Sequence, residues 1–380
     1  MNGSLEGGTV SVSGDAKQRF YDARGYGRPI GGNDVELTLV EAAHLLFRGD
    51  LDRIVDRRES SAAFGEPLEF EAFFRIAARI ADRFTRRFLV YSDLRDRGFY
   101  LSPTRQGWPG AALIGDRSGA DDGVGSGGDS GMGLPIDFAV YPRGSGPGDD
   151  ELAYRIAVVD ERERVPAAAL GGSVLAVVDE ESEISYFETT VPTVDGDTPY
   201  ELSATIDGEL VGDRVVCWEP PEGLHERGFY GQPLSARSAT IEGAIQLSLI
   251  EAAALAADGR LSLAERDDPY SVLLDRGRAV EGDRFDRRLA VYRTLRDRSI
   301  VPKTGYKFGA DFRTYDRVES VETLSHSERL IRVIPPDHVF DPTALSLDVR
   351  LAGGVRTRMV FASTDANGEI DWLEVGRLTP

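Results

Sequence analysis

The chain contains little cysteine and almost no lysine. Of its 380 residues only Cys217 is a cysteine, which excludes an intrachain disulfide and a zinc site built from cysteines. No apolar run approaches the roughly 18 residues of a membrane-spanning helix, and the N-terminus lacks the basic and apolar segments of a secretory signal. These absences predict a cytoplasmic location.

Lysine is restricted to Lys17, Lys303 and Lys307, so that 41 of the 44 basic residues are arginines, and the formal net charge is −20. An acidic chain with so few lysines is typical of a high-salt cytoplasm, where screening makes a large net charge tolerable. We therefore favour a halophilic source. A GC-rich genome, which favours arginine codons, would also explain the arginine bias.

The net charge does not decide whether nucleic acid is a partner. Acidity argues against it, because phosphates are usually met by basic patches. In molar salt, however, long-range attraction is screened, so RNA binding would rest on short-range arginine contacts and stacking.

The length predicts two or more domains, and the sequence repeats itself. Residues 82–97 and 283–298 are identical at eleven of sixteen positions, at an offset of 201. Two weaker matches, 37–51 with 247–261 and 179–188 with 365–374, occur in the same order. A tandem duplication explains this order better than chance.

The two halves of the duplication span roughly 20–190 and 220–380. Between them, 191–220 is rich in loop-forming residues and is expected to be a linker. The first half has an extra Gly/Ser/Asp-rich stretch at 115–133, which predicts a mobile loop. Its Gly-x-Gly-x-x-Gly at 123–128 neither follows a strand nor opens a helix, which argues against a dinucleotide site.

Periodicity predicts the same plan in both halves. Helices are expected at 38–47, 84–97 and 248–257, and another begins at Pro342 with Asp341 as its cap and ends at Gly353-Gly354. The apolar face of 84–97 is repeated in the second half by Phe285, Leu289, Tyr292 and Leu295. Strands are expected at 328–335, 359–364 and 370–375, with a turn at 365–368 between the last two. Strands mixed with single helices indicate a mixed α/β or α+β fold.

The most informative stretch begins at Gly305 and reads Gly-Tyr-Lys-Phe-Gly-Ala-Asp-Phe-Arg-Thr-Tyr, ending at Tyr315, with His326 and Ser327 after ten more residues. A phenol and an imidazole at this spacing can carry out metal-free acid–base chemistry on RNA. The pattern resembles the catalytic half of archaeal tRNA-splicing endonucleases. The resemblance is strong over 289–376 and, through the repeat, covers nearly the whole chain.

This resemblance implies two fused endonuclease-like repeats, the first inactive and the second active. Each would have a small N-terminal subdomain, at 1–82 and 221–283, followed by a nuclease-like subdomain with a mixed sheet, at 83–190 and 284–380. Two-repeat chains of this family pair as homodimers. The implied substrate is precursor tRNA folded into a bulge–helix–bulge, cut once at each intron end.

The resemblance also implies the catalytic roles. Tyr315 would act as general base on the 2′-OH and His326 as general acid on the departing 5′ oxygen, which leaves a 2′,3′-cyclic phosphate and a 5′-OH. No metal or cofactor is expected. Histidine suits the acid role because its pKa lies near working pH, whereas tyrosine needs a neighbouring cation to act as a base.

In the family that cation is a lysine, and the corresponding position here holds Thr357. Arg356 and Arg358 flank it, although on a strand they would point to the opposite face. A bulge could bring Arg358 into the site, and Lys307 is a further candidate. The sequence does not choose among these residues.

Two other residues are candidates for contact with RNA, and the first matches a family position. Arg350 corresponds to an arginine that holds a bulge nucleotide, and Trp372 on the last strand could stack on an extruded base. Ordinary core packing is the alternative for Trp372.

The first half keeps a tyrosine, Tyr141, but Glu151 falls near the position of His326. This half therefore looks inactive. This half also has an acidic turn, formed by Asp179, Glu180, Glu181 and Glu183. The resemblance implies that this turn binds a basic pocket of a catalytic unit in the dimer. A solvated turn in an acidic protein is the alternative.

Two rival functions remain. Loss of the lysine could leave an RNA-binding or assembly subunit with weak or no cleavage, although the intact Tyr315 and His326 argue against it. An unrelated nuclease or generic α/β domain would require the motif match to be accidental.

Overall fold

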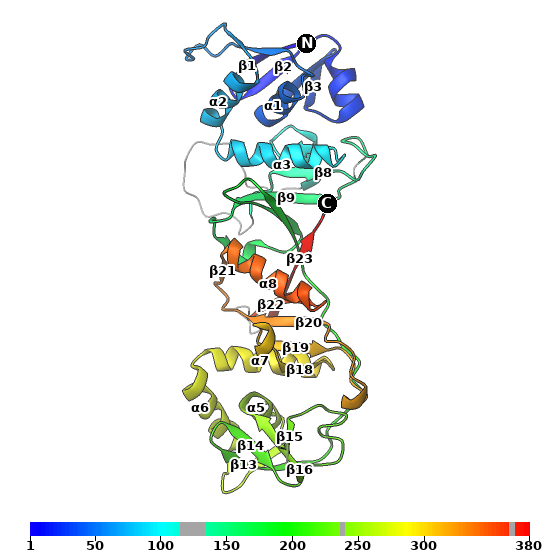
Figure 1. The fold of residues 1–380 in the computed structure, drawn as a ribbon, viewed down its shortest axis with the longest axis vertical. Coiled ribbons are helices and arrows are strands. Elements are labelled where there is room, and N and C mark those ends of the chain that lie inside the picture. Colours follow the sequence, from blue (N-terminus) through cyan, green and yellow to red (C-terminus); the bar gives the residue numbers. More distant parts are fainter. Residues whose placement is uncertain (115–133, 150, 236–239, 365–368) are drawn as a thin grey trace. The chain divides into compact units, whose positions relative to one another are not determined.

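A computed structural model describes residues 1–114, 134–149, 151–235, 240–364 and 369–380 (Figure 1). The predicted Gly-rich loop at 115–133 and the predicted turn at 365–368 lie outside these residues. The described chain forms two compact units. Unit 1 comprises Met1–Thr190, Val339–Leu345 and Arg377–Pro380, and unit 2 comprises Val191–His338 and Ser346–Gly376.

The N-terminal part of unit 1 is a six-stranded sheet with two helices, α1 (Leu39–Phe47) and α2 (Phe70–Ile80). Helix α1 begins where Thr38 and Glu41 form a capping box. The strand order of the sheet is β3-β4-β2-β1-β5-β6. The strands are β1 (Asn2–Glu6), β2 (Thr9–Val12), β3 (Arg28–Gly31), β4 (Asp34–Thr38), β5 (Arg53–Asp56) and β6 (Pro67–Leu68), with a helical turn η1 at Lys17–Asp22.

The C-terminal part of unit 1 packs helix α3 (Phe84–Asp96) on strands in the order β7-β8-β9-β11-β12. Strands β9 and β11 are parallel and their neighbours antiparallel. These strands are β7 (Leu101–Pro103), β8 (Phe138–Val140), β9 (Tyr154–Asp160), β11 (Ser173–Val178) and β12 (Ile184–Thr190). Smaller elements are α4 (Pro109–Ile114), η2 (Ala167–Ala169) and the pair β10 (Val165–Pro166) with β21 (Val339–Phe340).

The N-terminal part of unit 2 corrects the predicted linker. Residues 206–217 were expected to be loop but form strands β13 (Ile206–Val211) and β14 (Arg214–Cys217). Their alternating buried and exposed residues, joined by a turn at Gly212, explain the pairing. The strand order is β15-β16-β14-β13-β17, from β15 (Gln232–Ser235), β16 (Thr240–Ser248) and β17 (Leu261–Leu263), with helices α5 (Leu249–Ala257) and α6 (Pro269–Glu281).

The C-terminal part of unit 2 packs helix α7 (Arg284–Asp297) on strands in the order β18-β19-β20-β22-β23. Helix α8 (Pro342–Gly354) begins at the predicted cap, where Asp341 accepts hydrogen bonds from two backbone N–H groups. The strands are β18 (Val301–Thr304), β19 (Phe312–Tyr315), β20 (Arg329–Val333), β22 (Arg358–Thr364) and β23 (Ile370–Leu378), with turns η3 (Tyr306–Phe308) and η4 (Val321–Thr323).

Each unit therefore repeats one strand order, with one parallel pair (β9 with β11, β20 with β22) in the middle. This confirms the predicted mixed α/β fold. The described residues contain no helix that is long and apolar enough to cross a membrane.

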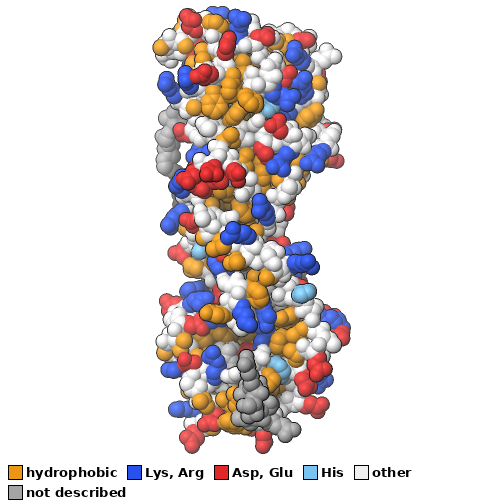
Figure 2. All heavy atoms as spheres, viewed as in Figure 1, with side chains coloured by type: hydrophobic (Ala, Val, Ile, Leu, Met, Phe, Trp, Pro, Cys, Tyr) orange, Lys and Arg blue, Asp and Glu red, His pale blue; other side chains and the backbone are white. Residues whose placement is uncertain are grey.

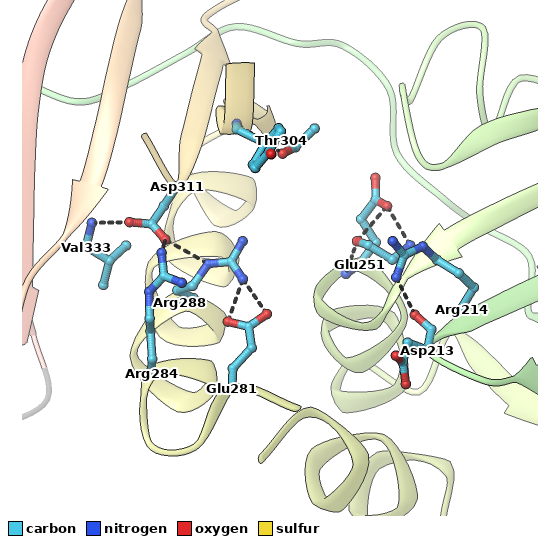
Figure 3. A network of polar contacts seen from close by, with 11 residues as sticks. Asp213, Arg214, Glu251, Glu281, Arg284, Arg288, Thr304, Asp311 and Val333 are labelled. Carbon is cyan, nitrogen blue, oxygen red and sulfur yellow. Dashed lines mark hydrogen bonds and ion pairs between the residues drawn. The ribbon is translucent and has the colours of Figure 1, made fainter. Parts of the chain in front are cut away.

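An arginine–aspartate clamp fixes the candidate strand β19 to helix α7 in unit 2 (Figure 3). Asp311, which is almost fully buried, accepts a hydrogen bond from the backbone N–H of Val333 and ion-pairs with Arg284 and Arg288. Asp137 in unit 1 makes the same contacts with Val158, Arg83 and Arg87. The clamp recurs in both units, so it serves the fold and not the activity of one repeat.

Candidate active site

Tyr315 is the last residue of β19 and lies opposite Val301 of β18. Its side chain is 5% exposed and packs against Phe229, Val301 and Val318. Its hydroxyl forms no hydrogen bond within the described residues. Packing thus fixes the ring of Tyr315, which keeps a small exposed area, whereas its counterpart Tyr141 in unit 1 is fully buried, hydroxyl included.

His326 is exposed and lies in the loop between η4 and β20. Two residues before it, Leu324 packs against the cluster around Tyr315. Two residues after it, Glu328 binds both chain neighbours of Tyr315: its N–H donates to the carbonyl of residue 314 at 3.0 Å, and its carboxylate accepts from the N–H of residue 316 at 3.1 Å. The residues on both sides of His326 are therefore tied to the surroundings of Tyr315.

A segment that was assigned to the linker also braces the stretch that follows Tyr315, which the sequence did not predict. The backbone N–H of Asp197 donates to the carbonyl of Asp316 at 2.7 Å, and the hydroxyl of Thr198 accepts from the N–H of Val318 at 3.1 Å. Only glycine fits at Gly196, where this segment passes close to Asp316, because a Cβ there would lie 2.7 Å from the carbonyl oxygen of Asp316. Sequence reasoning assigned this stretch to a linker, since such contacts leave no periodic signal.

Thr357 lies between α8 and β22, and both its N–H and its hydroxyl donate to the carbonyl of Ala352. Arg358 begins β22 beside β20, where its N–H donates to the carbonyl of Glu328. The register of β20 with β22 is regular, so the bulge considered from the sequence is absent. The side chain of Arg358 ion-pairs with Glu374 at 3.4 Å instead.

The other two candidates for the missing lysine, Lys307 and Arg356, lie in different places. Lys307 is exposed in η3, at the end of the β18–β19 hairpin opposite to Tyr315. Arg356 is exposed next to Thr357, has no charged partner within the described ranges and adopts a left-handed φ of 59°. A non-glycine residue in this region often marks a functional constraint. Of the three candidates, Arg356 is thus neither ion-paired within the described residues, as Arg358 is, nor at the far end of the hairpin, as Lys307 is.

Arg350 is exposed on α8 and, in the part of the chain that is described, has no ion-pair partner. Trp372, in contrast, is 7% exposed and belongs to the core of unit 2, opposite Ala362 on β22. Its burial favours the packing interpretation over base stacking.

The acidic turn between β11 and β12 is preformed by Asp179, whose carboxylate accepts from the N–H groups of Glu181 and Glu183. Glu180 pairs with Arg162 at 2.5 Å. Glu181 and Glu183 are exposed. Because the backbone of the turn is fixed, its carboxylates are presented without further ordering.

Unit 2 contains a cavity of about 600 Å³ between α5, α7 and the β18–β19 hairpin, and Figure 3 shows part of its lining. Lys303 in its wall pairs with Glu251 at 2.7 Å. Arg214 and Arg313 also line it and have no carboxylate partner among the residues described. The guanidinium of Arg313 lies 5.7 Å from the ring centre of Tyr315. The cavity thus carries two unneutralised cations.

The equivalent buried glutamates of the two repeats, Glu41 and Glu251, differ in charge environment. Burial raises the pKa of Glu41, which accepts hydrogen bonds from neutral groups, among them the indole of Trp108. Burial acts on Glu251 in the same direction, but the Lys303 ammonium and hydrogen bonds outweigh it and hold the pKa of Glu251 at about 2. Only the second repeat therefore keeps an ionised pair beneath its candidate site.

Two family models match parts of the chain. The family model described as tRNA intron endonuclease, catalytic C-terminal domain, matches residues 285–372. The model of the N-terminal domain of the same family matches twice, at 1–73 and 206–273.

Similarity to individual proteins extends over the whole chain. The chain is 51% identical over 382 residues to a tRNA-splicing endonuclease of Haloferax volcanii and 52% identical over 386 residues to one of Halobacterium salinarum. Both alignments cover the full length of both proteins. A tRNA-splicing endonuclease of Methanococcoides burtonii is 36% identical over 97% of each chain.

Proposed function

The chain belongs to the tRNA intron endonuclease family, and from this we propose that it cuts precursor tRNA at both ends of an intron folded as a bulge–helix–bulge. The observation that carries the proposal is the attachment of the His326 loop to both sides of Tyr315 in the second repeat. The products would be a 2′,3′-cyclic phosphate and a 5′-OH.

In this mechanism the Tyr315 oxygen removes the proton from the 2′-OH, which attacks the adjacent phosphorus. His326 donates a proton to the departing 5′ oxygen. A cation must stabilise the charge that develops on the phosphate oxygens, and we assign this role to Arg356 because Arg358 is engaged by Glu374. An arginine holds its charge permanently and can bind two phosphate oxygens at once.

We propose one active site per chain. In unit 1, burial raises the pKa of Tyr141 to about 12, and its hydroxyl is enclosed. Glu151 stands near the place of the histidine. A buried tyrosine with a raised pKa is a poor base, and the first repeat also lacks the histidine.

Two cuts then require two chains. We propose a homodimer in which the acidic turn Asp179–Glu183 of one chain enters the cavity in unit 2 of the other. Support comes from complementary charge: exposed carboxylates on Glu181 and Glu183, and unneutralised guanidinium groups of Arg214 and Arg313 in the cavity.

The second candidate function, an RNA-binding or assembly subunit with little cleavage, is favoured by one observation. Thr357 replaces the lysine of the family, and the neighbouring Arg358 is directed to Glu374. The exposed His326 and the presence of Tyr315 in the cluster next to its loop favour the enzyme.

One assay separates the two. Purified protein is incubated with an intron-containing precursor tRNA in molar potassium chloride and EDTA, and the fragment ends are mapped. Two cuts with cyclic-phosphate ends are expected. Binding without cleavage would support the assembly subunit, and cleavage abolished by EDTA would contradict a metal-independent mechanism.

A further inference from the structure

Phe229 holds a backbone conformation that is unfavourable for phenylalanine. Its φ is 52°, in the left-handed region that glycine occupies without cost and a bulky residue rarely adopts. Such a residue persists only where its surroundings compensate for the strain.

The equivalent turn of the first repeat has glycine at this position. The N–H of Phe229 donates to the carbonyl of His225, and the N–H of Tyr230 donates to the carbonyl of Leu224. In unit 1 the N–H groups of Gly25 and Tyr26 form the same two hydrogen bonds. Gly25 also has a left-handed φ, of 64°. Phe229 therefore occupies the position at which the inactive repeat has glycine.

The side chain gained at this position contacts the candidate base. The ring of Phe229 is 4% exposed, and its centre lies 5.7 Å from that of Tyr315 at an interplanar angle of 54°. His225 packs on Phe229 edge-on at 5.7 Å. Since Phe229 comes from the N-terminal part of unit 2, it links that part to the strand that carries Tyr315.

Lys303 holds the strained turn in place. Its ammonium donates to the carbonyl oxygens on both sides of the turn, Phe229 at 3.1 Å and Gly231 at 3.2 Å, and pairs with Glu251 at 2.7 Å. It also lies 4.8 Å from the centre of the Phe229 ring. The equivalent residue of unit 1, at the offset of 201, is Ser102. The second repeat thus combines a strained residue with a lysine anchor at this turn, whereas Arg95 holds the carbonyl oxygens of Arg24 and Gly25 in the unstrained turn of the first repeat.

We propose that Phe229 is a positioning residue that fixes the ring of Tyr315 for catalysis, with Lys303 and Glu251 locking its backbone. The inference rests on the proposed function, since it assigns Phe229 a role in the same reaction. Loss of the aromatic ring would let the phenol of Tyr315 move, and small displacements of a reacting group are costly in rate.

The test uses Phe229→Leu and Phe229→Ala in the full-length protein. Single-turnover cleavage of precursor tRNA at saturating enzyme is expected to fall about 10- to 100-fold for Phe229→Leu, and further for Phe229→Ala, by the cost of misplacing a reacting group. The dissociation constant for the precursor should stay within about twofold, because Phe229 contacts Tyr315 and not solvent.

The matched control is Phe73→Leu, which truncates an equally buried phenylalanine in unit 1. It should lower the melting temperature comparably and leave the cleavage rate unchanged. If the wild type cleaves and Phe229→Leu cleaves at the wild-type rate, the inference is overturned while the proposed function stands. Equal rate losses in Phe229→Leu and Phe73→Leu would likewise overturn it, and a wild type that binds without cleaving would overturn the proposed function as well.

Discussion

Equivalent residues of the two repeats differ most where the second repeat has its candidate site. Tyr141 is fully enclosed whereas Tyr315 keeps a small exposed area, and Phe229 stands where the first repeat has Gly25. Because both repeats share one fold, each difference provides an internal control for the residue that the second repeat has gained.

The sequence predicted Tyr315 and His326, and the fold brings their surroundings together, because both lie in one local pattern. Phe229 and Gly196 could not be predicted. Their roles depend on a positive φ and on a close approach between segments far apart in the chain. Trp372 was ambiguous for a related reason, since a tryptophan on a strand can face the core or RNA.

The cation assignment predicts different effects for two neighbouring arginines. Arg356→Asn should lower the single-turnover cleavage rate by about 100-fold, as for loss of one group that stabilises developing charge. Asparagine tolerates the left-handed backbone there. Arg358→Asn, the matched control, removes only an exposed ion pair with Glu374 and should cleave within about threefold of wild type. The reverse ranking would transfer the role to Arg358.

The Lys303–Glu251 pair predicts a dependence of stability on pH. The pKa of Glu251 in the folded state, about 2, lies below its ordinary value of 4.5, so the pair stabilises the protein above pH 4.5 and this contribution is lost as the pH falls toward 2. Lys303→Met should cost about 3–5 kcal/mol at neutral pH, because it leaves a buried charge unpaired.

Without the lysine, we expect burial to outweigh the remaining hydrogen bonds of Glu251, as it does at Glu41, and to raise its pKa, so the contribution of this group should then fall as the pH rises. Denaturant titrations in molar salt across this range would show the reversed slope. Lys307→Met, an exposed lysine in the same motif, is the control and should behave as wild type. An unchanged pH profile in Lys303→Met would show that the pair is not ionised.

At the scale of elements, the long helices and the strands near the motif followed from periodicity and capping. Helix α8 begins after Asp341 as predicted, and α7 buries the predicted Phe285, Leu289, Tyr292 and Leu295. Strands β13 and β14 were missed because they are short and follow loop-rich sequence. Their pairing partners, β16 and β17, lie later in the chain, so no local signal identifies them.

The ends of the equivalent helices α3 and α7 give a second matched pair. Gly98 and Ser299 each follow their helix in a left-handed conformation, with φ of 87° and 56°. Gly98→Ser should therefore destabilise the protein by about 1 kcal/mol, and Ser299→Gly should be neutral or stabilising by up to about 1 kcal/mol. Denaturant unfolding measures both changes. A stabilising Gly98→Ser would contradict the backbone argument.

At the scale of the whole molecule, charge of both signs is spread over the surface, and acidic and basic side chains are interspersed on the face shown in Figure 2. With a net charge of −20, association between copies requires local complementarity. The acidic turn and the cavity in unit 2 supply it in the proposed dimer.

The dimer proposal predicts that neutralising the turn weakens association. The triple variant Glu180→Gln, Glu181→Gln, Glu183→Gln keeps Asp179, which forms the turn. Sedimentation in molar salt should show twice the chain mass for wild type and a shift toward monomer for the variant. The same neutralisation at the exposed Glu59, Glu66 and Glu69 is the control and should leave the dimer intact. Equal effects of both triples would attribute association to net charge.

The central claim is that the second repeat performs the chemistry through a tyrosine that the first repeat has enclosed. The most direct measurement compares single-turnover cleavage of precursor tRNA, in EDTA, by wild type, Tyr315→Phe and Tyr141→Phe. We predict a loss of about 100- to 10,000-fold for Tyr315→Phe, the range for a general base, and the wild-type rate for Tyr141→Phe. Wild-type cleavage by Tyr315→Phe, or an equal loss in both variants, would contradict the account.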